Sequence, residues 1–92
     1  MKIVADMSLY PLKEGPIPEI IEFIQTLRER AGLEVVTNQL STQLRGEFEA
    51  VTSAINDCMR QAMAAPNTVV LVVKYLNVEL VINRSPTLTP PG

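Results

Sequence analysis

The sequence predicts a single α+β domain in which a four-stranded antiparallel sheet carries two helices on one face. Segments with strand periodicity and segments with helix periodicity follow one another in the order β, α, β, β, α, β. A polar hairpin joins the second and third strands, and an unbroken apolar run over residues 69–73 marks the last strand. The chain has 92 residues, of which 47% are hydrophobic, so it can form one core but not two.

The first strand is predicted over residues 3–10, where an apolar side alternates with a mixed side. The apolar side holds Ile3, Ala5, Met7 and Leu9, and the mixed side holds Val4, Asp6, Ser8 and Tyr10. Pro11 ends this strand, and Pro18 suits the first turn of a helix because its missing N–H would have no partner there. Apolar residues then recur at helical spacing, namely Ile17, Ile20, Ile21, Ile24 and Leu27. Gly32 suits the end of this helix.

The second half of the chain predicts a hairpin, a helix and a strand. Residues 33–39 and 41–46 form the two strands of the hairpin. Glu47 opens a helix whose apolar stripe consists of Phe48, Val51, Ile55, Cys58, Met59 and Ala62. Residues 68–75 form the last strand, and its continuous apolar run predicts burial on both faces.

This order of elements is typical of the ferredoxin-like βαββαβ sandwich, whose first and third strands lie at the centre of the sheet. Both helices cover one face, so a partner subunit, a ligand or water must cover the other. The apolar last strand argues against water, and we therefore expect a homo-oligomer. The ferredoxin-like domain is expected to span residues 1–76. Residues 77–92 are interpreted as an edge strand or interface arm at 78–82, followed by a Pro-rich tail.

Composition excludes several classes of function. Eight Lys and Arg residues against ten Asp and Glu residues, without a basic cluster, argue against a nucleic-acid partner. No apolar run approaches the roughly 20 residues of a membrane span, and Asp6 lies where a signal peptide would be apolar, so we expect no membrane partner and a cytoplasmic location. One cysteine and no histidine exclude disulfide frameworks, thiol and imidazole metal clusters and His-dependent triads. We expect no metal site, no catalytic residue, no cofactor and no enzyme activity.

Asp6 is the most informative polar residue, because an acid in the middle of a central strand is costly to bury without a cation or several donors. Two interpretations stay open: a salt bridge to Arg45 or Lys74, or an anchor for a ligand that carries a cation or an amine. Ser8 shares the face of Asp6. Tyr10 is open to two interpretations: it stacks on a flat ligand ring, or it packs at the strand end with its hydroxyl in water. Further small polar side chains crowd the hairpin, namely Thr37, Ser41, Thr42 and Gln43.

Two motifs carry a resemblance to a known family. The run SLYPL over residues 8–12 and the run TNQLSTQLRG over residues 37–46 resemble the thiamine-binding family of small ferredoxin-like proteins, which has a single-unit MTH1187 type and a tandem YkoF type. This chain holds one unit, so it resembles the single-unit type. The resemblance implies that the open sheet face binds thiamine or its pyrimidine half, hydroxymethylpyrimidine, in dimers or tetramers assembled through their sheets.

The resemblance also implies site residues. Ser8 and Tyr10 match the strand motif, whereas Thr37, Ser41 and Thr42 match the hairpin motif. Asp6 joins this ligand-binding set on the physical argument above. A carboxylate with several hydroxyls suits thiamine, which carries a thiazolium charge and a pyrimidine amine.

Two other functions are compatible with this topology. Acylphosphatases share it, but they use an arginine in the loop after the first strand, and residues 11–16 contain none. The remaining alternative is a regulatory or structural oligomerisation module that binds no small molecule, in which a basic side chain would bridge Asp6.

Overall fold

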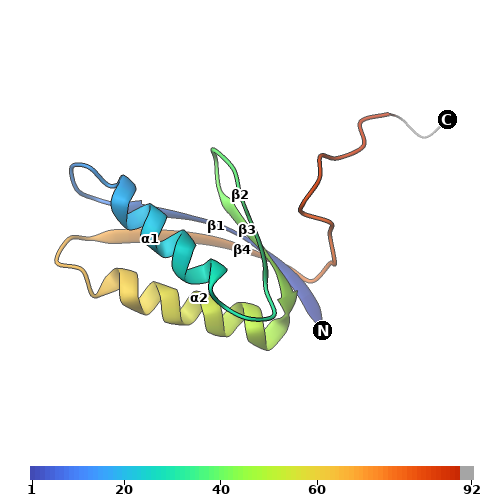
Figure 1. The fold of residues 1–92 in the computed structure, drawn as a ribbon, viewed down its shortest axis with the longest axis horizontal. Coiled ribbons are helices and arrows are strands. Elements are labelled where there is room, and N and C mark those ends of the chain that lie inside the picture. The colour runs from blue at the N-terminus through green and yellow to red at the C-terminus, as the bar shows by residue number, and fades with distance from the viewer. Residues whose placement is uncertain (90–92) are drawn as a thin grey trace.

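The computed structural model describes residues 1–89 and contains six elements in the predicted order (Figure 1). They are β1 (Lys2–Pro11), α1 (Ile17–Arg28), β2 (Glu34–Thr37), β3 (Thr42–Glu47), α2 (Phe48–Met63) and β4 (Val69–Leu76). The strands form one antiparallel sheet in the order β2-β3-β1-β4, so β1 and β3 lie at its centre. The predicted ferredoxin-like α+β fold is confirmed. The end of the predicted Pro-rich tail, residues 90–92, lies outside the described residues.

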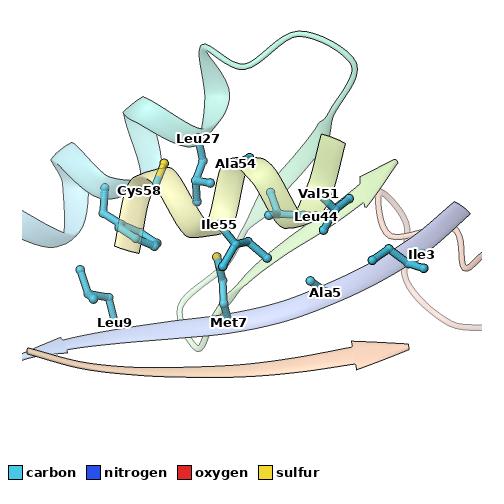
Figure 2. Packing of buried hydrophobic residues seen from close by; sticks show 11 residues of the cluster. Ile3, Ala5, Met7, Leu9, Leu27, Leu44, Val51, Ala54, Ile55 and Cys58 are labelled. Carbon is cyan, nitrogen blue, oxygen red and sulfur yellow. The ribbon is translucent and has the colours of Figure 1, made fainter. Parts of the chain in front are cut away.

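The core lies between the sheet and the two helices. Figure 2 shows alternate side chains of β1 pointing towards α2, with Leu27 of α1 above them. The buried apolar cluster consists of Ile3, Ala5, Met7, Leu9, Phe23, Leu27, Leu44, Val51, Ala54, Ile55 and Cys58. The predicted apolar side of the first strand is thus confirmed. Cys58 is buried in this core, and burial raises the pKa of its thiol, which makes it a poor nucleophile.

The buried stripe of α1 differs from the predicted one. Phe23 and Leu27 are buried, but Ile17 and Ile21 are 59% and 48% exposed. The helix therefore turns the side that carries Phe23 towards the sheet, and its outer isoleucines stay on the surface. In α2, Ala54 joins the buried stripe, whereas Phe48 at the first helical position remains partly exposed.

The expectation that β4 is buried on both faces is wrong for the single chain. Val70 and Val72 are 42% and 49% exposed, while the intervening residues of β4 pack against the core on the helix side. An unbroken apolar run hides the alternation of a strand, because both sides carry the same kind of residue. The sheet surface away from the helices, here called the open face, therefore carries exposed valines in addition to Asp6 and Ser8.

The chain beyond β4 forms no helix or strand over residues 77–89 and extends away from the domain (Figure 1). Residues 78–82, predicted as an edge strand or interface arm, form no strand within this chain. Glu79 ties the segment to the sheet, because its carboxylate lies 2.6 Å from a guanidinium nitrogen of Arg45 and 3.8 Å from the Lys2 ammonium. None of the helices within residues 1–89 is long and apolar enough to cross a membrane.

Candidate functional site

The sheet has an opening at the hairpin end, because β3 is shorter than β1. The ladder between them stops where Thr42 pairs with Met7, so residues 8–11 of β1 have a strand only on the β4 side. On the other side, α1 and the hairpin tip border a half-open cavity of about 230 Å³, which we call the hairpin notch. Its lining residues are Met7, Ser8, Leu9, Tyr10, Ile20, Phe23, Ile24, Thr37, Asn38, Gln39, Leu40, Ser41 and Thr42.

The notch brings together five of the six side chains that the sequence singled out. Those five are Ser8, Tyr10, Thr37, Ser41 and Thr42. The sixth, Asp6, lies behind the notch on the open face. A smaller cavity of about 100 Å³ between α1 and α2 contains none of the six.

The two threonines do not lie on the open face as expected. Thr42 pairs with Met7, whose side chain points to the helices, whereas Gln43 pairs with Asp6 on the open face. Neighbouring residues of a strand point to opposite faces of the sheet, so Thr42 and its partner Thr37 face the helix side whereas Gln43 does not. Their hydroxyl oxygens are 3.1 Å apart. Because Ser8 and Tyr10 of the open face line the same cavity, the notch connects the open face to the helix side of the sheet.

Asp6 has the cationic partner that one of the two interpretations required. Its carboxylate lies 3.4 Å from the Lys74 ammonium, and the Gln43 amide donates to it at 3.3 Å and to the Ser41 hydroxyl oxygen at 2.6 Å. Arg45, the other predicted partner, pairs instead with glutamates on β2 and in the tail. The Ser41 hydroxyl first, and then Gln43 and Lys74, hold the pKa of Asp6 below its usual value despite partial burial. Lys74 is 73% exposed, so this ion pair is open to solvent.

The hairpin tip is held in place by Asn38, which the sequence analysis did not use, and by Ser8. The Asn38 carboxamide oxygen accepts the backbone N–H groups of Leu40 and Ser41 at 2.9 and 3.1 Å, the pattern of an Asx turn. The Ser8 hydroxyl donates to the Leu40 carbonyl at 3.3 Å and so fastens the tip to β1. An asparagine shortly before two small polar residues was the available signal for this turn.

The notch combines one apolar wall with one polar wall. Ile20, Phe23 and Ile24 of α1 supply the apolar wall, and none of them was predicted as a site residue. The hydroxyls of Ser8 and the paired threonines supply donors and acceptors on the other side. Such a site suits a small flat molecule with polar edges. Within residues 1–89, no cluster of three or more acidic or thiol side chains could hold a metal ion.

We expect Asp6 to make the fold less stable in acid. Because its pKa is lower in the folded state than in the unfolded chain, its contribution is present above about pH 4 and is lost as the pH falls through the lowered pKa. The free energy of unfolding, measured by urea titration, should therefore fall less between pH 5 and pH 3 for Asp6→Asn than for the wild type. Glu14→Gln, in the exposed loop before α1, is the control and should match the wild type. An equal acid dependence of Asp6→Asn and wild type would refute this assignment.

Fold and site together define a ferredoxin-like α+β domain with a small notch, apolar on one side and polar on the other, at the hairpin end of its sheet. The model of the YKOF-related family matches residues 2–86, and the chain belongs to this family. The resemblance that the two motifs indicated is thereby confirmed.

Solved structures agree on the fold. Protein MJ1052 from Methanocaldococcus jannascii has a TM-score of 0.74 and 22% identity, and the match covers 95% of this chain and 88% of that one. Protein SP2199 from Streptococcus pneumoniae has a TM-score of 0.67 and 22% identity, with 90% and 92% covered. A candidate thiamine biosynthesis/salvage protein from Thermotoga maritima, TM0486, has a TM-score of 0.59 and 18% identity, with 89% and 91% covered. A search of curated proteins finds no match.

Proposed function

We propose that this protein binds thiamine or its pyrimidine half, hydroxymethylpyrimidine, in the hairpin notch, and that it does so as a homo-oligomer without catalysing a reaction. The observation that carries the proposal is the gathering of five side chains, predicted as ligand-binding, around one cavity. Membership of the YKOF-related family supports it, as does the structural likeness to the Thermotoga maritima protein described in terms of thiamine biosynthesis and salvage.

The size and chemistry of the notch favour the pyrimidine half. Its volume of about 230 Å³ is below the roughly 300–1,000 Å³ typical of pockets for drug-sized ligands, so it suits a single substituted ring. The ring would pack against Phe23, and the hydroxyls of Thr37 and Thr42 would meet its polar edge. In whole thiamine, the thiazolium would extend towards the open face and compete with the exposed Lys74 ammonium for the Asp6 carboxylate.

A thermal-shift panel of thiamine, its phosphates and hydroxymethylpyrimidine tests the proposal. A ligand that binds only the folded state must raise the melting temperature. Calorimetry with Thr37→Val then locates the site, because this change removes a hydroxyl from the notch and keeps the shape of the side chain. We expect binding of hydroxymethylpyrimidine to weaken roughly two- to tenfold, the equivalent of one hydrogen bond.

Thr52→Val is the matched control, because the Thr52 hydroxyl bonds to carbonyls of its own helix, away from the notch. It should bind like the wild type. If no compound of the panel raises the melting temperature at millimolar concentration, or if Thr37→Val binds as tightly as Thr52→Val, the proposal is wrong.

A second candidate is an oligomerisation module without a small-molecule ligand. The observation in its favour is that Lys74 already neutralises Asp6, next to exposed valines on the open face. A protein that is oligomeric but unaffected by every compound of the panel would support this candidate against the first.

A further inference from the structure

The main chain of β1 points one donor and one acceptor into the hairpin notch. The Leu12 N–H bonds to the Thr68 carbonyl beside β4 at 2.8 Å, so the even-numbered residues of β1 direct their peptide groups to β4. Odd-numbered residues direct theirs to the other side, where Met7 meets Thr42 as the last pair with β3. The next odd-numbered residue is Leu9, and its N–H and C=O point to where β3 is missing.

The hairpin tip does not occupy this donor and acceptor. In the register of β1 with β3, Leu40 would lie opposite Leu9. However, the Leu40 N–H donates to the Asn38 side chain, and its carbonyl accepts the Ser8 hydroxyl. Within residues 1–89, none of the hydrogen bonds of this tip reaches Leu9. Leu9 is only 8% exposed, and buried main-chain groups are nearly always hydrogen-bonded.

A peptide strand does not fit this edge. Strand addition needs a series of main-chain donors and acceptors along the edge. The next candidate after Leu9 is Pro11, which has no N–H, and its carbonyl already accepts the Lys13 N–H at 3.1 Å. The edge therefore offers a single pair of groups, which suits a small molecule.

We propose that Leu9 recognises, through its own N–H and C=O, an aromatic ring that carries an amino group beside a ring nitrogen, as in a 4-aminopyrimidine. The ring nitrogen accepts the Leu9 N–H, and the amino group donates to the Leu9 carbonyl. The inference rests on the proposed function and names the edge of the ligand that is recognised.

Amide hydrogen exchange of the ¹⁵N-labelled full chain tests this directly. In the free protein, the Leu9 amide should exchange faster than the Met7 amide, although both residues are buried, because only Met7 is paired with β3. On addition of 4-amino-5-hydroxymethyl-2-methylpyrimidine, the Leu9 amide should become at least tenfold more protected and its proton should shift downfield. The Tyr10 amide, which faces β4, serves as the control and should change little.

The ligand without its amino group, 5-hydroxymethyl-2-methylpyrimidine, should bind roughly two- to tenfold more weakly, as expected for one lost hydrogen bond. If the aminopyrimidine binds and Thr37→Val weakens it, but Leu9 exchange stays unchanged, the inference is wrong and the proposed function stands. If Leu9 is already as protected as Met7 without ligand, the inference is equally wrong. If neither pyrimidine binds, the proposed function and the inference fall together.

Discussion

Replacing Gly46 with alanine is expected to lower the free energy of unfolding by about 1–3 kcal/mol, the usual cost of overpacking. For a domain of this size, that corresponds to a fall in melting temperature of roughly 4–24 °C. A Cβ atom at Gly46 would lie 2.8 Å from the backbone carbonyl oxygen of Gly32 and 3.1 Å from a methyl carbon of Leu33. The Leu33 side chain can move, but a backbone oxygen cannot move without displacing the loop before β2.

Gly15→Ala is the control, because it separates backbone strain from crowding. Gly15 has a φ of +62°, yet a Cβ atom there would have nothing within 4 Å. Its replacement should therefore cost only the left-handed conformation, about 1–2 kcal/mol. Thermal melts of both variants decide the matter: a Gly46→Ala variant that melts like the wild type would show that the Gly32 loop yields and that crowding at Gly46 is unimportant.

The order of elements could be predicted because each segment has a clear period. In β1, polar and apolar residues alternate, and the structure buries Ile3, Ala5, Met7 and Leu9 accordingly. Where the pattern is ambiguous, prediction was wrong. Five large apolar residues of α1 fall at helical spacing, but the sequence also holds Phe23, and only packing against the sheet decides which side is buried. In β4, polar and apolar residues do not alternate, so the sequence did not show which valines are exposed.

The candidate site could be predicted only in part, and the reason is similar. The residue types of the notch are apparent in the motifs, but their faces depend on the hairpin register, which pairs Thr42 with Met7 and puts two threonines on the helix side. The pairing of Asp6 with Lys74 was one of two interpretations, and the sequence could not choose between Lys74 and Arg45. Main-chain groups such as those of Leu9 leave no trace in a side-chain pattern.

We expect the protein to form a symmetric homo-oligomer through the open face, and Val72→Asp to dissociate it. Val70, Val72 and Leu76 of β4 are 42%, 49% and 36% exposed, and Tyr10 lies beside Val70 on β1 at 52%. A symmetric contact would bury this apolar strip of both subunits at once. A carboxylate at position 72 would be desolvated there, and the nearby Lys74 is already paired with Asp6, so burying the new charge is costly. In a monomer the same carboxylate would remain in water. Light scattering coupled to gel filtration at micromolar concentration measures the mass of both proteins.

Ile21→Asp provides the matched comparison, since Ile21 is 48% exposed but lies on α1, on the opposite side of the sheet from the open face. It should leave the oligomer intact, because a helix-side charge does not enter a contact between sheets. A wild-type mass near the 10.2 kDa of one chain would disprove the oligomer itself. If Ile21→Asp dissociated the oligomer and Val72→Asp did not, the subunit contact would lie on the helices, with the exposed isoleucines of α1 at its centre.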